Sequence, residues 1–173
     1  MPPQTDRGLP AELRLRPLST TDAEQLRPLN DAAAPALPIT AAADLAHLIP
    51  VSALALGIER DDQLVGFVIA LAPRADYDSE NYRYFESRGV DHLYVDRIVI
   101  DEAERGAGLG AVLYAAVFDA AREQGRTEVT CEVNLDPPNP GSMAFHRRLG
   151  FRELGSQPTK GGSVTVALLS ATL

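Results

Sequence analysis

The stretch from Asp101 to Tyr114, DEAERGAGLGAVLY, restricts the possible folds more than any other, because its centre is Gly-Ala-Gly-Leu-Gly. Glycine loses more backbone entropy on folding than any other residue, so such a cluster needs a reason. The preceding run, DHLYVDRIVI, is rich in β-branched residues and predicts a strand. From Leu109 onward, apolar residues recur at helical spacing. A glycine-rich turn between a strand and a helix favours a phosphate-bearing ligand held against bare backbone.

The other patterns predict one mixed α/β domain over residues 11–173, preceded by a loose tail over residues 1–10. Strand-like runs occupy residues 12–18, 51–59, 63–72, 127–135 and 162–170, and the second and third form a hairpin around RDD. Helices are expected after Ser19, at about residues 40–48, from Leu109 to near Gly125, and in a short proline-bounded stretch closing at Gly150. Residues 73–89 are charged and aromatic without a clear period.

Composition removes several classes of function. The net charge of −8 argues against nucleic-acid binding, because phosphate backbones demand a basic face. Lys160 is the only lysine, so the glycine stretch lacks the lysine of a P-loop. Cys131 is the only cysteine, which excludes an intramolecular disulfide and fits a cytoplasmic protein. His47 and His92 lack metal-ligand spacing, and the most apolar tract is interrupted; we expect no metal and no membrane partner.

Two other interpretations of the glycine stretch stay open at this point. Gly106, Gly108 and Ala111 satisfy the relaxed dinucleotide fingerprint G-x-G-x-x-G/A. Against it, five mostly charged residues separate Ile100 from the first glycine, and too little chain follows for a doubly wound sheet. The second interpretation is structural: the glycines permit close helix–strand packing, and Arg105 is a solvated charge.

The neighbouring sequence shifts this balance toward one family. RIVIDEAERGAGLG resembles the acyl-CoA-binding signature of the GNAT (Gcn5-related N-acetyltransferase) superfamily, and NPGSMAFHRRLGF resembles the second signature of that superfamily. The resemblance covers roughly residues 12–170. It implies a single-domain GNAT fold: a central, mostly antiparallel twisted sheet of about six to seven strands with helices on both faces. It also implies a splay between the strands near residues 93–100 and 127–134.

The resemblance further implies that acetyl-CoA or another acyl-CoA is the co-substrate. In the superfamily the pantetheine arm lies along the central strand, here beside Ile98, Val99 and Ile100. An asparagine bonds the cofactor near its pantetheine end, which is Asn139 here. The pyrophosphate would be bound by the loop made of Arg105, Gly106, Ala107, Gly108, Leu109 and Gly110, whose helix N-terminus offers unpaired N–H groups and a partial positive charge.

The implied reaction is direct acyl transfer to an amine, by an acyltransferase that transfers groups other than aminoacyl groups. Many members use a tyrosine as the acid, and His146 occupies that position here. Asp96 and Glu132 lie on the strands expected to flank the cleft and are candidate bases, with an Asp96–Arg97 ion pair as the alternative. Asp96 shares strand parity with Ile98 and Ile100 and is expected on their side. A role of Cys131 as an acyl carrier is the less favoured interpretation, since a single cysteine in a strand is usually part of the core.

The aromatic segment before the central strand is the expected place for acceptor recognition. Tyr82, Tyr84 and Phe85 are candidate walls of an amine pocket; the alternative is an ordered surface loop that packs on the core or forms a homodimer contact. The expected partner is a small-molecule, amino-acid-like amine. Because the usual tyrosine is missing, a CoA-binding sensor or scaffold of the same fold is the alternative function, and a dinucleotide-binding enzyme is the third.

Overall fold

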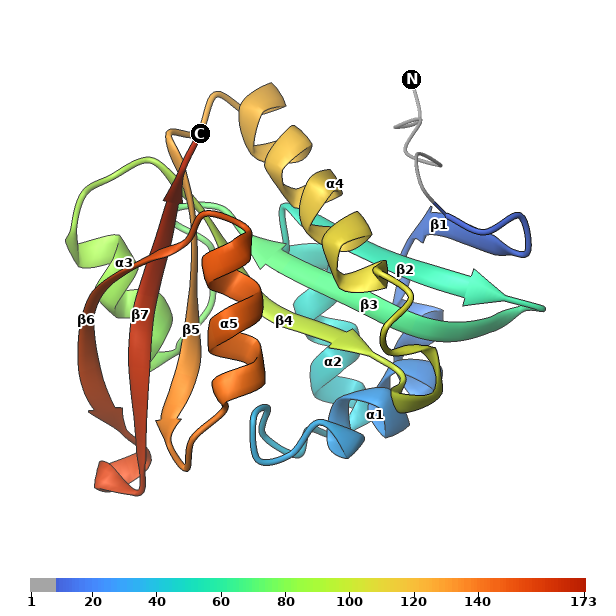
Figure 1. The fold of residues 1–173 in the computed structure, drawn as a ribbon, viewed down its shortest axis with the longest axis horizontal. Coiled ribbons are helices and arrows are strands. Elements are labelled where there is room, and N and C mark those ends of the chain that lie inside the picture. The colour runs from blue at the N-terminus through green and yellow to red at the C-terminus, as the bar shows by residue number, and fades with distance from the viewer. Residues whose placement is uncertain (1–8) are drawn as a thin grey trace.

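The computed structural model describes residues 9–173 as a seven-stranded sheet with helices on both faces (Figure 1). The strands are β1 (Leu13–Pro17), β2 (Leu54–Arg60), β3 (Gln63–Leu71), β4 (His92–Ile100), β5 (Glu128–Asp136), β6 (Arg152–Thr159) and β7 (Val164–Thr172). The helices are α1 (Ala23–Ala32), α2 (Ala42–Val51), α3 (Glu80–Ser87), α4 (Leu109–Glu123) and α5 (Pro140–Arg148). Most of the predicted N-terminal tail, residues 1–8, lies outside the described residues.

The sheet has the order β1-β2-β3-β4-β5-β7-β6, and only the β4–β5 pair is parallel. That pair is short: it runs from His92 opposite Glu128 to Tyr94 opposite Thr130. Beyond this point β4 and β5 diverge, so the sheet opens between them (Figure 1). The predicted mostly antiparallel sheet and its splay are confirmed.

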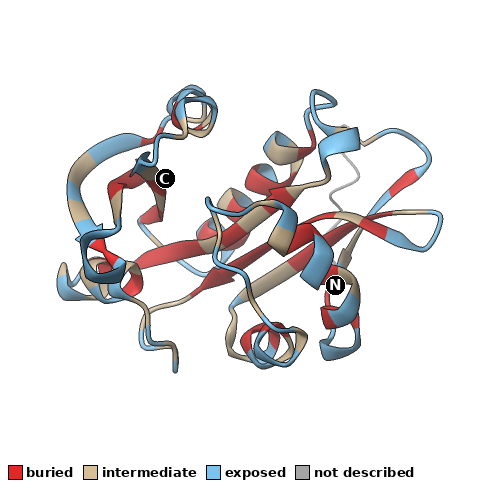
Figure 2. Ribbon diagram, turned by 90° about the horizontal axis from the view of Figure 1, so that it is seen from below, coloured by how far each residue is buried: buried red, intermediate tan, exposed pale blue. Residues whose placement is uncertain are grey.

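Two hydrophobic cores lie on the two faces of the sheet. Side chains of α4 and α5 pack on one face, around Leu113, Tyr114 and Phe151. Side chains of α1, α2 and α3 pack on the other, around Leu26, Leu45 and other fully buried residues. Figure 2 shows buried residues running along the strands and on the inner faces of the helices. With both faces covered, the polar residues that remain buried include Asn30 on α1 and His146 on α5 as well as strand residues such as Arg97 and Thr130.

Two elements escape the sequence patterns. Residues 73–89 contain α3, which begins where the Ser79 hydroxyl accepts a hydrogen bond from the Tyr82 N–H. A helix of eight residues buries only two side chains, which is too few to give a clear period. The second is β6, an edge strand with a single buried residue, so it lacks the apolar alternation that indicates a strand.

Candidate active site

A cleft of about 910 Å³ lies where the splay opens, and we call it the glycine-loop cleft. One side is the end of β4, Ile98–Ile100, with the loop that leads into α4. The opposite side is Asn139 and one face of α5, which includes Ser142, Phe145 and His146. Residues 32–36, which follow α1, line it as well. Of the predicted cofactor residues, all except Ala107 line this cleft.

The glycines of the loop are required for different reasons. Gly106 and Gly108 have φ of +85° and +78°, and a Cβ at either would meet nothing within 4 Å. Their requirement is therefore conformational, since side chains rarely adopt this backbone region. Gly110 has no positive φ, but a Cβ there would lie 3.0 Å from the Phe145 ring. The third glycine thus lets α4 approach α5, a helix–helix contact in place of the helix–strand packing that was considered from the sequence.

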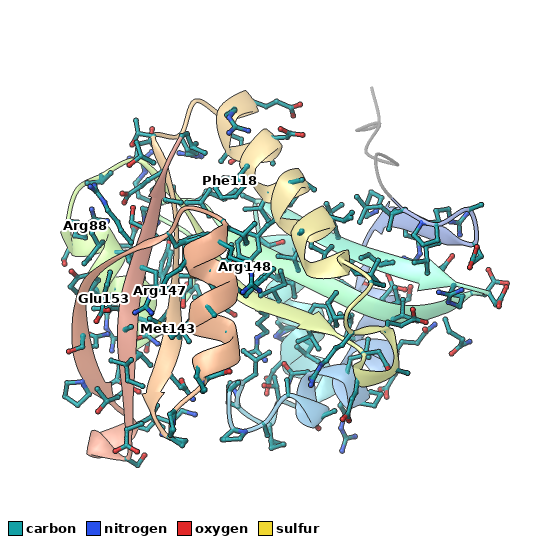
Figure 3. The ribbon with its side chains drawn as sticks, in the orientation of Figure 1. Arg88, Phe118, Met143, Arg147, Arg148 and Glu153 are labelled. Carbon is teal, nitrogen blue, oxygen red and sulfur yellow. The ribbon has the colours of Figure 1, made fainter. Side chains whose placement is uncertain are left out.

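Two arginines give this cleft a positive character. Arg105 and Arg148 both line it, and within residues 9–173 neither side chain makes a salt bridge or hydrogen bond. The neighbouring Glu104 does not neutralise them, because both of its oxygens accept hydrogen bonds from Arg60 at 3.0 Å. Figure 3 shows Arg148 on the side of α5 toward α4, and Arg147 on the opposite side.

Sequence reasoning missed Arg148, although a signal for it exists. Gly141, Phe145 and Arg148 are spaced four and three apart along α5, and all three line the cleft. Residues with this spacing share one face of a helix. Asn139, which was predicted, begins α5: its side-chain oxygen accepts a hydrogen bond from the Ser142 N–H at 3.3 Å.

A second hollow of about 400 Å³, which we call the acid pocket, lies beside the first within the splay. It contains both predicted acids, Asp96 and Glu132. Further lining residues come from the segment before α3 and its first turns, from β4, from β5 to β7, and from the α1–α2 connection: Tyr77–Asn81, Arg83, Arg97, Asn134, Thr159, Lys160 and Pro35–Pro38. The two hollows share Pro35, Ala36 and Asn134 as a common wall.

The carboxyl of Glu132 is held by a tyrosine from the neighbouring strand. The Tyr94 hydroxyl lies 2.9 and 2.8 Å from its two oxygens. Burial, together with the nearby charge of Asp96, raises the pKa of Glu132 to about 8, because a buried carboxylate loses hydration that its neighbours only partly replace. Glu132 is therefore a carboxyl that exchanges its proton near neutral pH.

Asp96 stands on a β-bulge, which makes the parity prediction for it wrong. Successive residues of β3, Ile69 and Ala70, pair with Arg97 and Val95, so Asp96 is the extra residue of β4. Beyond the bulge the two faces are exchanged: Val95 and Ile98 both pack in the α4–α5 core. Asp96 itself lies on the other face from Ile98, where it accepts a hydrogen bond from the Tyr77 hydroxyl at 2.8 Å.

The expected ion pair of Asp96 is present as well. Arg97 Nε donates to Asp96 Oδ2 at 3.1 Å. Burial raises the pKa of Asp96, while the Arg97 charge and the Tyr77 hydroxyl oppose that rise. Asp96 forms this buried ion pair and still lines the acid pocket. The ion pair and the place of a candidate base are therefore compatible for this side chain.

His146 is enclosed and fully hydrogen-bonded. It is 4% exposed, Nδ1 lies 2.7 Å from the Ser142 carbonyl oxygen, and Nε2 lies 2.7 Å from the Tyr114 hydroxyl. Nδ1 must donate to the carbonyl, so Nε2 accepts from Tyr114. Burial lowers the pKa of His146, which favours this neutral form. No N–H of the ring is left over to donate into the cleft.

The aromatic residues predicted to bind the acceptor do not line the acid pocket. Tyr82 is 2% exposed and Phe85 is fully buried in the core, and Tyr84 packs edge-on against Phe85. From the same segment, Tyr77–Asn81 and Arg83 line the pocket instead. Helical geometry explains the difference, because the buried face of α3 carries Tyr82 and Phe85. Cys131 is buried, and burial raises the pKa of its thiol, as expected for a core cysteine.

Within residues 9–173, no three His, Cys, Asp or Glu side chains are grouped so that they could hold a metal ion. Over the same residues, no helix has the length and apolar character needed to cross a membrane.

Known proteins resemble this chain in sequence and in structure. A family model described as the acetyltransferase (GNAT) family matches residues 23–151. L-Methionine sulfoximine/L-methionine sulfone acetyltransferases of Pseudomonas aeruginosa and Pseudomonas paraeruginosa are 35% identical over 83 residues, which is 47% of this chain and 45% of each relative. The matched region thus spans less than half the length of these relatives.

Among solved structures, the ribosomal-protein-S18-alanine N-acetyltransferase from Escherichia coli superposes with a TM-score of 0.70 at 17% identity, over 92% of this chain and 93% of that chain. Ard1 from Thermoplasma volcanium superposes with a TM-score of 0.73 at 19% identity, over 94% and 99%. Arabidopsis thaliana Naa50, solved with the bisubstrate analogue CoA-Ac-MVNAL, gives 0.71 at 17% identity, over 94% and 100%. At these identities the likeness is one of fold.

Proposed function

Because the chain belongs to the acetyltransferase (GNAT) family, we propose that it transfers an acetyl group from acetyl-CoA directly to the amine of a small, amino-acid-like acceptor. One observation carries the proposal: the glycine-loop cleft and the acid pocket meet at Pro35, Ala36 and Asn134. A donor in the first hollow and an amine in the second would approach each other across this shared wall.

The chemistry of the glycine-loop cleft fits coenzyme A. Its volume is within the range of small-molecule sites, and Arg105 and Arg148 offer forked donors for phosphate oxygens beside the N-terminus of α4. Beyond Tyr94, β4 pairs with no strand of residues 9–173 on its β5 side, so the backbone of Ile98–Ile100 is open there to the amides of a pantetheine arm. Bound acetyl-CoA would supply the acetyl thioester.

Glu132 is the base in this proposal. The amine nitrogen must lose a proton when the new C–N bond forms and the thioester C–S bond breaks, and a carboxylate in the acid pocket can accept it. With a pKa raised to about 8, Glu132 is a stronger base than an ordinary glutamate. Lys160 and Arg83 at the same pocket are groups suited to an acceptor carboxylate, and the Pseudomonas relatives are named for amino-acid acceptors.

His146 has a positioning role in this proposal, and the sequence-based assignment of an acid to it is not retained. A general acid must carry a proton directed at the leaving group, whereas both ring nitrogens of His146 are engaged with Ser142 and Tyr114. This imidazole instead ties α5 to α4 across the cleft wall.

We expect His146→Ala to lower the melting temperature by about 5–10 °C, since it removes a buried, hydrogen-bonded ring. Because general acids contribute about 10²–10⁴-fold, kcat at saturating amine should stay within about tenfold of wild type. Steady-state kinetics and thermal unfolding check this. A fall in kcat of about a hundredfold with an unchanged melting temperature would instead restore His146 as the acid.

The missing tyrosine at position 146 favours one second candidate, a CoA-binding sensor or scaffold without catalysis. The two candidates share the cleft and differ only in the use of the acid pocket. A thermal-shift panel comes first: acetyl-CoA at about 100 times its Kd should raise the melting temperature by about 5–10 °C, and NAD should leave it unchanged. Stabilisation by NAD alone would overturn both candidates.

Free-thiol release from acetyl-CoA against a panel of amines then separates enzyme from sensor. We expect release with amino acids that carry a free α-amine, and none with their N-acetylated forms, which lack a nucleophilic amine. Stabilisation by acetyl-CoA without release for any amine would favour the sensor.

A further inference from the structure

The wall between the two hollows is the α1–α2 segment, residues 33–41, and a single buried arginine supports it. Arg97 on β4 is 8% exposed. Its Nη1 donates to Asn30 Oδ1 at 2.7 Å and to Thr40 Oγ1 at 2.8 Å. Its Nε donates to Asp96 Oδ2 at 3.1 Å. One guanidinium therefore holds both the segment and a carboxylate of the acid pocket.

Both partners of Arg97 Nη1 hold the segment at the same carbonyl. Asn30 Nδ2 donates to the Pro38 oxygen at 2.9 Å, and Thr40 Oγ1 donates to the same oxygen at 2.8 Å. Both side chains can do this while accepting from Arg97, because an amide and a hydroxyl each donate and accept. The path from the strand to the segment is thus continuous: Arg97, then Asn30 and Thr40, then Pro38.

A further polar support at this end is the Thr40 N–H, which donates to Asp31 Oδ1 at 3.1 Å. The segment is rich in alanine and proline, most of its residues are exposed, and Ile39 is 67% exposed. Ala33 and Leu37 pack partly on the core. At its other end, Asn134 of β5 donates to the Pro35 oxygen at 3.3 Å. A chain stretch with so little buried apolar surface relies on such polar contacts for its position.

This arrangement has a consequence for the acid pocket. Pro35–Pro38 line that pocket, while residues 32–36 line the glycine-loop cleft. The contacts of Arg97 act at Pro38 and Thr40, which is the end of the segment at the acid pocket. The opposite end, toward the glycine loop, receives none of them. A change in these contacts should therefore weaken acceptor binding more than it weakens donor binding.

We propose that Arg97 is a positioning residue for the acceptor: it fixes the α1–α2 segment and Asp96 in one arrangement, and so sets the shape of the pocket in which the amine meets Glu132. The proposal rests on the proposed transferase function. It assigns no contact between Arg97 and the reacting atoms, since the three contacts of Arg97 are to Asp96, Asn30 and Thr40.

The experiment uses Thr40→Val, which removes the hydroxyl but keeps the volume of the side chain. Two hydrogen bonds of the path are lost, and Arg97 keeps Asp96 and Asn30. We expect the acceptor KM to rise about five- to tenfold, the size of one or two lost hydrogen bonds. The KM for acetyl-CoA should change by less than about twofold, and Thr40→Ser should restore the wild-type values.

A matched control lies at the far end of the sheet. Thr127 Oγ1 donates to the Asp91 oxygen at 2.9 Å, so Thr127→Val removes a similar hydroxyl-to-carbonyl bond away from both hollows. It should leave both KM values unchanged. Arg97→Met removes the hydrogen bonds of the guanidinium to Asp96, Asn30 and Thr40 and should lower kcat/KM for the acceptor by about a hundredfold or more, while acetyl-CoA still stabilises the folded variant.

Amide hydrogen exchange gives a readout independent of turnover. Residues 33–41 should exchange faster in Thr40→Val than in wild type or Thr127→Val, because the segment loses its support. Two results in Thr40→Val would overturn the role of Arg97 but not the proposed function: normal turnover with an unchanged acceptor KM, or an equal rise of the KM values for the acceptor and for acetyl-CoA. A wild-type protein that transfers acetyl to no amine would instead overturn the proposed function.

Discussion

Glu132→Gln is expected to lower kcat/KM for the acceptor by about 10²–10⁴-fold, the usual contribution of a general base. Glutamine keeps the size of the side chain and can still accept a hydrogen bond from Tyr94, but it cannot take a proton from the amine. Steady-state kinetics with a fixed, saturating concentration of acetyl-CoA measure the effect. The binding of acetyl-CoA, followed by thermal shift, should be unchanged because Glu132 does not line the glycine-loop cleft.

The pH dependence gives this prediction its sharpest form. A base must be deprotonated to act, and the pKa of Glu132 is raised to about 8. The wild-type kcat/KM should therefore rise with pH and level off above about 8, and the variant should lose that inflection. The Tyr94 hydrogen bond holds the pKa of Glu132 down against burial, so Tyr94→Phe should move the inflection to higher pH.

Stability should change in the opposite direction to activity. Because the pKa of Glu132 is higher in the folded than in the unfolded chain, the folded chain binds more protons between about pH 4.5 and 8. Wild-type stability therefore falls as pH rises through this window. Relative to wild type, Glu132→Gln should become more stable over the same window, as unfolding midpoints at several pH values would record.

Glu153→Gln is the control, since Glu153 is exposed on β6 away from both hollows (Figure 3). It should alter neither the pH profile of kcat/KM nor the melting temperature. An unchanged inflection near pH 8 in Glu132→Gln would contradict the assignment of Glu132 as the base and would turn attention to Asp96, the other predicted acid in the acid pocket.

The sequence predicts the parts of this site that are local in the chain. The turn from β4 into α4 depends on glycines within a few residues of one another, and Gly106 and Gly108 adopt the positive φ for which glycine is needed. The start of α5 at Asn139 is equally local. The mixed sheet and its splay followed from two such motifs and their order along the chain.

What escaped prediction depends on partners that are distant in sequence. The bulge at Asp96 exists only in the register between β3 and β4, so strand parity within β4 was misleading. His146 appears as a proton donor in the sequence, and only the contact with Tyr114 on α4 shows that its Nε2 is occupied. Arg97 and Tyr77 gain their places in the acid pocket through Asn30, Thr40 and Asp96 in the same way.

These contacts between residues far apart in the sequence make the two hollows of the splay chemically different. The glycine loop presents backbone, two cations and a helix N-terminus, which suit a phosphate-rich donor. The acid pocket presents two carboxyls whose pKa values are both raised by burial. Coulomb repulsion favours charging only one of two neighbouring carboxyls at a time, and Arg97 pairs with Asp96 rather than with Glu132. Asp96 is thereby the better stabilised anion, which supports the proposal that Glu132 is the carboxyl that exchanges a proton.

Replacing Arg105 and Arg148 together with glutamine is expected to weaken acetyl-CoA binding by about 10²–10⁴-fold. A hydrogen bond to a charged group contributes about 1.5–3 kcal/mol, which corresponds to roughly tenfold to a hundredfold in Kd for each arginine. Both side chains are exposed and make no ion pair within residues 9–173, so their loss should leave the melting temperature of the free protein unchanged. Calorimetric titration with acetyl-CoA measures the change in affinity.

The same pair of arginines should control the salt dependence of binding, which separates their charge from their shape. Exposed charges are screened at high ionic strength, so wild-type affinity should fall as salt rises, and the double variant should respond less. Arg147→Gln is the matched control: it lies next to Arg148 on α5 but on the opposite side of the helix (Figure 3) and does not line the cleft. A loss of affinity in Arg147→Gln as large as that in the double variant would mean that overall charge, and not the two arginines of the cleft, attracts the phosphates.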